Sequence, residues 1–156
     1  MRQQIEWLHK KFQTILSGEP WYGRPVYTLL QEVDSKKALR KPDSSSHSMI
    51  ELLYHLITWA DFTLKRMEED RVHDLAYSEA LDWRAIDPAV HTWKDGVASF
   101  KAINTRLMKM LKTKDDAWLR TKVDYRKYDF RFLLEGILDH HIYHIGQIAY
   151  LHKMEY

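Results

Sequence analysis

The chain has 156 residues, of which 45% are hydrophobic and 13% aromatic, and it contains no cysteine. Disulfide bonds, thiolate metal ligands and a cysteine nucleophile are therefore excluded, which leaves histidine and carboxylate side chains as the strong metal ligands. The formal net charge is +2 with basic and acidic residues interleaved, so nothing indicates a nucleic acid or an anionic membrane as a partner. The length predicts a single domain over residues 1–156.

The start of the chain and its apolar runs set the expected location. Residues 1–12 are polar every few positions and lack the apolar core of a signal peptide. No apolar run approaches the length of a membrane span. We therefore expect a cytoplasmic protein with no membrane partner. Five glycines and four prolines are few for a chain of turns and short strands, so the composition favours helices.

Apolar residues at helical spacing predict four long helices joined by polar connectors. The first helix is expected over residues 2–17, and a short helical piece over residues 26–33 follows it. The second long helix is expected over residues 48–69. It opens on Ser48-x-x-Glu51, which is a capping box that satisfies the free amides of the first turn.

The second half of the chain predicts two more long helices after a polar connector at residues 70–87. The third is expected to open at Asp87-Pro88, an N-cap followed by proline at the first helical position, and to reach residue 112. Asp129 is expected to cap the fourth. The inner stripe of this last helix is predicted to contain Phe130, Leu133, Ile137, His140, His144, Ile148 and Leu151.

These elements predict an all-α fold, a four-helix bundle. The connection of about 17 residues between the second and third helices is long enough to run back along a helix of roughly 30 Å. An up-down-down-up topology follows, with the last helix antiparallel to the second. In that order His55 and His144 lie at nearly the same level, whereas parallel packing would offset them by about 12 Å.

Two histidines of the last helix have the spacing of a metal-binding pair. His140 and His144 are four residues apart, so both rings leave the same helix face one turn apart and can hold one ion. Imidazoles on an inner stripe cost desolvation free energy unless something binds them. A third ligand must come from elsewhere, and His55 in the second helix is the best candidate. Spacing alone also permits His141 in place of His140.

Two motifs resemble the DinB/YfiT-like superfamily: HxxxHxGQ at residues 140–147 and SxxExxxH at residues 48–55. The resemblance extends over the whole chain in helix count, connector lengths and motif order. It implies that His55, His140 and His144 together bind one divalent metal ion, zinc or nickel, and leave coordination positions open for water. Relatives by this resemblance include thiol-dependent S-transferases, a mycothiol-dependent isomerase and hydrolases.

The implied function is a metal-dependent enzyme that activates water or a low-molecular-weight thiol towards a small-molecule substrate, with a homodimer allowed. Two alternatives stay open: a non-catalytic metal-binding or stress-response bundle, and a metal-free helical interaction domain. Four residues are candidates for supporting the ligands. Gln147 could orient a ligand or substrate, and Glu51 could accept the second ring proton of His55 beside its capping role. Tyr143 and Asp139 rank below them.

Overall fold

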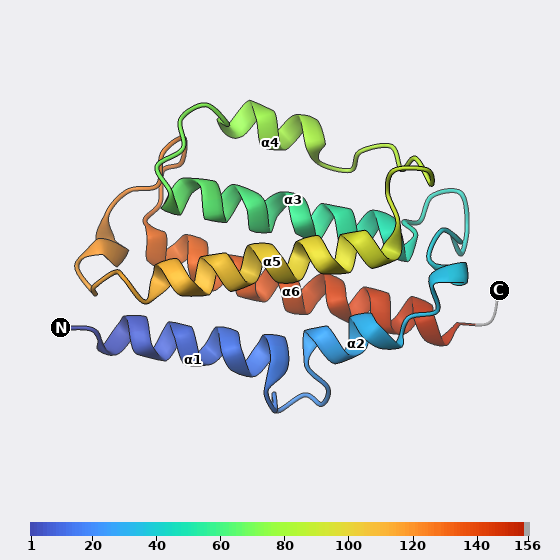
Figure 1. The fold of residues 1–156 in the computed structure, drawn as a ribbon, viewed down its shortest axis with the longest axis horizontal. Helices are drawn as coiled ribbons and strands as arrows, with labels where there is room; N and C mark the ends of the chain where they lie inside the picture. Colours follow the sequence, from blue (N-terminus) through green and yellow to red (C-terminus); the bar gives the residue numbers. More distant parts are fainter. Residues whose placement is uncertain (155–156) are drawn as a thin grey trace.

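The computed structural model describes residues 1–154, which form six α-helices and two short 3-10 helices without a β-strand (Figure 1). The elements are α1 (Gln3–Ser17), α2 (Val26–Glu32), η1 (Ser35–Lys37), α3 (Met49–Met67), α4 (Leu75–Leu81), α5 (Trp93–Leu111), η2 (Trp118–Arg120) and α6 (Phe130–Lys153). The predicted all-α class is confirmed for this range, and the last two residues of the predicted domain lie outside it. None of these helices combines the length and the apolar character that crossing a membrane requires.

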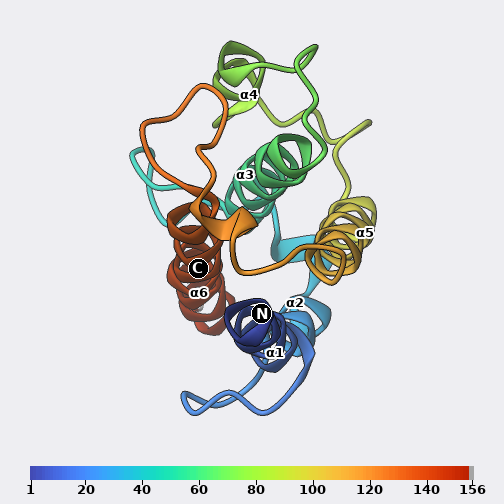
Figure 2. The same cartoon turned by 90° about the vertical axis from the view of Figure 1, so that its left-hand side faces the viewer.

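The long helices α1, α3, α5 and α6 surround a common core. Figure 2 looks along them and shows the four around one centre, with α4 outside α3. In Figure 1, α1 and α6 run in one direction while α3 and α5 run in the other. Because α3 packs against both α5 and α6, the helix that carries His55 contacts the helix that carries the other two candidate ligands.

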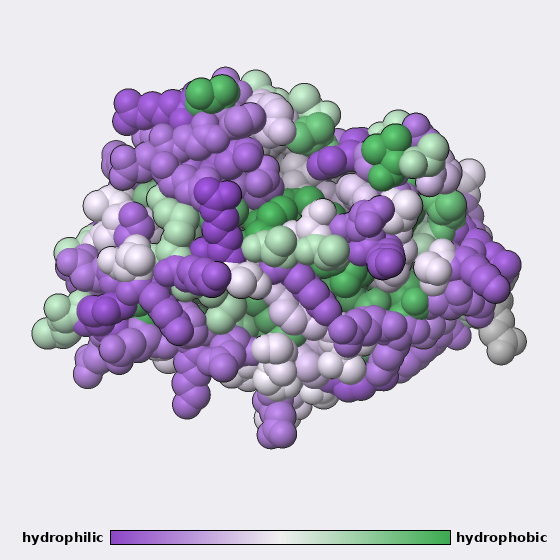
Figure 3. All heavy atoms as spheres, viewed as in Figure 1, coloured by the Kyte–Doolittle hydropathy of each residue, from purple (hydrophilic) through white to green (hydrophobic). Residues whose placement is uncertain are grey.

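Buried apolar side chains from these helices form one cluster. Phe12 of α1, Phe62 of α3 and Phe100 of α5 are each at most 1% exposed. On the face shown in Figure 3, hydrophilic residues cover most of the surface and hydrophobic ones show mainly in recesses near its middle. The burial of these apolar side chains stabilises the packing of α3 against α6 and so fixes the distance between the two helices.

The predicted caps set the register of the helices that carry the histidines. The Oγ of Ser48 accepts the backbone N–H of Glu51 at 3.3 Å, and the Glu51 carboxylate accepts the backbone N–H of Ser48 at 2.7 Å. At the start of α6, the carboxylate of Asp129 accepts the N–H of Phe132 at 2.9 Å. Each cap fixes where the first turn begins, and hence which face every later residue takes.

The predicted start of the third long helix was wrong. The helix α5 begins at Trp93, because Thr92 is its N-cap and accepts the N–H of Asp95 at 3.1 Å. Asp87 instead closes a turn in which its carboxylate accepts the N–H of Ala89 at 2.9 Å. An aspartate before a proline is favoured both as a helix N-cap and at the start of a turn. Here it starts a turn, and α5 begins at the later N-cap, Thr92.

The sequence-based prediction also missed α4 in the connector over residues 70–87. Asp74 caps this helix by accepting the N–H of Tyr77 at 3.0 Å. Of its seven residues only Ser78 is buried, so no apolar stripe marks it in the sequence. The residues that follow this helix, Asp82 and Trp83, contact His55.

Candidate metal centre

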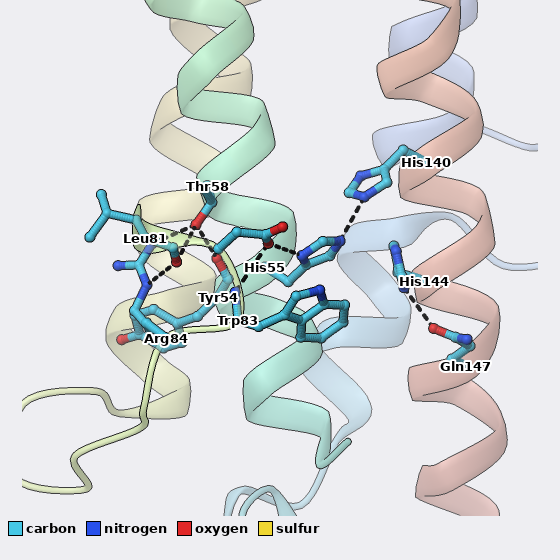
Figure 4. Close-up of polar contacts among 10 residues, drawn as sticks. Tyr54, His55, Thr58, Leu81, Trp83, Arg84, His140, His144 and Gln147 are labelled. Carbon is cyan, nitrogen blue, oxygen red and sulfur yellow. Dashed lines mark hydrogen bonds and ion pairs between the residues drawn. The ribbon is translucent and has the colours of Figure 1, made fainter. Parts of the chain in front are cut away.

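His55 of α3 meets His140 and His144 of α6 at one place in the structure (Figure 4). One ring nitrogen from each histidine lies within 4.8 Å of the other two. The Nε2 atoms of His55 and His140 are 2.9 Å apart. The ring centroids of the three pairs are 4.8, 4.6 and 4.5 Å apart. The structure therefore brings together the three residues that were expected to share an ion.

The partners of the rings leave lone pairs for an ion. The carboxylate of Asp82 can only accept, so the Nδ1 of His55 donates to it and the Nε2 keeps its lone pair. The Oε1 of Gln147 accepts from the Nδ1 of His144 at 2.6 Å, and this ring also keeps a lone pair on Nε2. Nitrogen ligands around a tetrahedral ion with bonds of about 2.0–2.1 Å lie roughly 3.3 Å apart, close to the observed Nε2 separation. The donor set fits a divalent metal ion.

Burial keeps these imidazoles in the neutral form that binds metals. His55 and His144 are 7% and 8% exposed. Burial, together with the proximity of His144 and His55, lowers the pKa of His140 to about 3. The pKa of His55 and that of His144 are also lowered, in both cases mainly by burial, against the opposing hydrogen bonds of Asp82 and Gln147. At neutral pH the cluster therefore presents uncharged ring nitrogens.

Glu51 does not accept the second ring proton of His55. Its carboxylate accepts the backbone N–H and the hydroxyl of Ser48, at 2.7 and 2.9 Å, and pairs with Lys41 at 2.7 Å. These contacts hold the carboxylate at the N-terminus of α3, where it forms part of the capping box. The partner of His55 is Asp82, in the segment that follows α4.

The other sequence candidates on α6 differ in how closely they approach the cluster. Gln147 holds the ring of His144 through the hydrogen bond described above. Tyr143 is 65% exposed and contacts the ring of His144 edge-on, with centroids 4.9 Å apart. Asp139 is exposed on the helix surface. His141 is fully buried on another face, where its Nε2 lies 3.2 Å from the Oδ1 of Asn104 on α5.

Trp83, in the segment that follows α4, also belongs to the site. Its indole lies flat against the imidazole of His55, with centroids 3.9 Å apart and planes at 11°. His47 stacks on the indole in the same way at 3.7 Å and 11°. The backbone of Trp83 has φ 46°, which is uncommon for a bulky residue, and its N–H donates to Asp82 at 3.1 Å.

Arg84 attaches this segment to α3 (Figure 4). Its Nε donates to the carbonyl of Leu81 at 3.0 Å and its Nη2 to the hydroxyl of Thr58 at 2.5 Å. Thr58 lies on α3 one turn beyond His55 and is 3% exposed. These bonds bridge the two segments and so position the Asp82 carboxylate and the Trp83 indole over His55. No local motif marks them, since they act only after the chain has folded back.

Two hollows lie beside the cluster along α6. The larger, of about 510 Å³, is lined partly by His47, Tyr143, Gly146 and Gln147. The second, of about 320 Å³, has His140 in its wall and is otherwise mostly apolar. Both volumes suit small organic molecules. The cluster thus has space for small molecules on two sides.

Two helices thus direct three histidines, two of them buried and His140 half-buried, at one point, and such a helical protein could bind a metal ion. The sequence profile of the DinB superfamily matches residues 25–148, a range that contains all three histidines. The chain belongs to the DinB superfamily, which confirms the resemblance. No curated protein matches it.

Proposed function

We propose that this protein is a metal-dependent enzyme in which His55, His140 and His144 hold one divalent ion, zinc or nickel. The observation that supports it most directly is the convergence of one ring nitrogen from each histidine within 4.8 Å. An ion with three imidazole ligands supplies a Lewis acid with an open position, where water or a low-molecular-weight thiol is acidified for attack on an electrophile. The reaction type is therefore that of a hydrolase or a thiol S-transferase.

The side chains around the ligands have defined roles in this proposal. Asp82 keeps the proton of His55 on Nδ1, and Gln147 does the same for His144, so that both Nε2 atoms face inward. Trp83 covers one face of the His55 ring and limits the access of water. The hollows beside His140 and Gln147 receive the small-molecule substrate and its co-reactant.

The proposal includes the finer architecture. The long helices form one four-helix bundle in up-down-down-up order, and the chain is a single domain. The opposed helix directions in Figure 1 and the single cluster of buried apolar residues support this order. A cytoplasmic location and a homodimer remain compatible with it.

Metal analysis of purified protein tests the site. We expect one zinc or nickel ion per chain after loading, and the loss of stoichiometric metal in His55→Ala, His140→Ala and His144→Ala. His9→Ala on α1 serves as the matched control and should retain the ion. Full retention of the ion by His144→Ala would refute the assignment.

Assays on the loaded protein test catalysis separately. A panel of ester, amide and thiol-transfer substrates should reveal turnover that disappears with the ion and returns when it is restored. If the ion is bound stoichiometrically but no substrate in the panel reacts, the results would favour a non-catalytic metal-binding or stress-response bundle.

A further inference from the structure

The hollow beside His140 is an apolar cavity between α3 and α6. Its wall includes Trp59 and Phe62 from α3 and Phe132 and Ile137 from α6. Its volume of about 320 Å³ is at the lower end of the range found for small-molecule sites. Because His140 forms part of the same wall, a molecule in this cavity lies next to the metal centre.

Gly136 extends the cavity to the backbone of α6. It lines the hollow, and a Cβ built on it would meet no heavy atom within 4 Å. A larger side chain at this position would therefore fill the cavity without a steric conflict at its first carbon. The same is true of Gly146 further along α6, which lines the other hollow. The two glycines form a natural pair for separating the roles of the two spaces.

The guanidinium of Arg126 lies against the aromatic wall of the cavity. Its Cζ is 5.8 Å from the ring centre of Trp59, 5.3 Å from that of Phe62 and 6.0 Å from that of Tyr128. All three rings line the cavity. The faces of aromatic rings attract a cation, so these contacts hold the positive charge beside an otherwise apolar space.

Among residues 1–154, no carboxylate forms an ion pair with Arg126. Within residues 1–154 its Nε–H is buried without an acceptor, and no carboxylate lies within 4.0 Å of its guanidinium. The side chain as a whole is half-buried, but leaving the Nε–H of a guanidinium buried and unpaired costs free energy, which a bound anion would recover. A guanidinium pairs best with a planar carboxylate, which can accept two hydrogen bonds from it.

We propose that this cavity is the substrate site and that the substrate is an organic carboxylate with an aromatic or other apolar body. The body occupies the space between Trp59, Phe132 and Gly136, and the carboxylate pairs with Arg126. This inference rests on the proposed function, because His140 places the cavity beside the ion. It adds the class of compound on which that centre acts.

Two probes that share the phenylbutyl skeleton and differ in the head group, a carboxylate or an uncharged hydroxyl, test the inference: 4-phenylbutyrate and 4-phenylbutanol. Binding is measured by calorimetry and by the change in tryptophan fluorescence, with zinc-loaded and with metal-free protein. We expect the carboxylate to bind about tenfold more tightly than the alcohol, since a hydrogen bond to a charged group contributes a factor of that order. The preference should be present in both forms of the protein. A preference that disappears with the zinc would place the carboxylate on the ion and overturn the assignment to Arg126.

Three variants sharpen the test. Arg126→Met keeps the apolar stem and should bind both probes equally well. Gly136→Leu should abolish binding of both, whereas the matched Gly146→Leu on the same helix should bind them as the wild type does. Thermal unfolding confirms that each variant is folded. Unchanged binding in Gly136→Leu, or equal binding of the two probes by the wild type, would overturn the inference.

Metal content separates the two proposals. Wild-type protein that takes up one zinc ion but neither probe contradicts the substrate class and leaves the metal centre standing. Wild-type protein that binds the probes through Arg126 but takes up no zinc contradicts the proposed function.

Discussion

His55 donates its Nδ1–H to the carboxylate of Asp82, a residue 27 positions later in the chain. The same carboxylate accepts the backbone N–H of Trp83, whose indole stacks on the His55 ring. A carboxylate behind a ligating imidazole fixes its tautomer and orientation and raises its basicity. The orientation of His55, the proposed metal ligand on α3, therefore depends on the segment that follows α4, and not on the neighbouring turn of its own helix.

Removing the carboxylate of Asp82 should weaken metal binding without removing a ligand. For Asp82→Asn we expect zinc affinity to fall by about 10- to 100-fold, which is the usual cost of losing such a partner. Competition with a chromophoric chelator measures the affinity. Asp87→Asn in the same connector is the control, because Asp87 is exposed and contacts only its own turn. Equal affinities for Asp82→Asn and the wild type would show that the hydrogen bond has no part in the site.

The sequence predicted those parts of the fold that local patterns specify. Ser48 and Asp129 cap α3 and α6 as expected, and α6 buries most of its predicted inner stripe, with His140 and Leu151 half-buried. His140 and His144 could be paired from their spacing, and the family motif added His55. Each of these features depends on residues only a few positions apart in the sequence or belongs to the family motif.

The remaining parts of the site depend on tertiary structure. The helix α4 buries only Ser78, so its amphipathic signal is too weak to read. The contact of Asp82 with His55 exists only because Arg84 ties the following segment to Thr58 on α3. An aspartate in a polar connector has no local feature that distinguishes such a partner from a solvated carboxylate.

Replacing the helical glycines by alanine should stabilise the protein at Gly136 and Gly146 and destabilise it at Gly96. Alanine is favoured over glycine in a helix by about 1 kcal/mol, so Gly136→Ala and Gly146→Ala should each stabilise the protein by up to that amount. Neither Cβ would meet a heavy atom within 4 Å. In Gly96→Ala, by contrast, the Cβ would lie 2.8 Å from the Cδ2 of Leu53 and 3.1 Å from the ring of Tyr54, and we expect a net loss of stability. Denaturant unfolding measures all three, and stabilisation by Gly96→Ala would contradict the close packing of α5 on α3.

Zinc binding should resist acid better than ordinary histidines would allow. A proton competes with the ion only when the pH approaches the pKa of the ligand, and burial lowers the pKa of His140 to about 3 and also lowers that of His55 and His144. We expect zinc affinity to change little between pH 8 and 6.5 and to decline only well below the ordinary histidine pKa of about 6.5. Chelator competition across this range checks it. A steep decline that begins above that value would show that the rings are not buried as the structure has them.

His141 should make the metal-free protein less stable in acid. It is fully buried, and burial together with His140 and His144 lowers its pKa to about 3. In the unfolded chain a histidine titrates near 6.5, so between these two values the unfolded state binds more protons than the folded state. The free energy of unfolding therefore falls as the pH falls from about 6.5 towards 3, by up to about 1.4 kcal/mol per pH unit for this group. Above 6.5 the full stability is present.

The double variant His141→Leu/Asn104→Leu isolates this contribution. The Nε2 of His141 lies 3.2 Å from the Oδ1 of Asn104, so replacing both residues avoids leaving one buried polar group without its partner. Denaturant unfolding of metal-free protein between pH 4 and 8 should show a shallower dependence on pH in this variant than in the wild type. The proposed ligands His140 and His144 are present in both proteins, so most of their own titration is common to the two curves. Identical pH dependence would mean that His141 already carries a proton in the folded protein, which its buried position against Phe100 opposes.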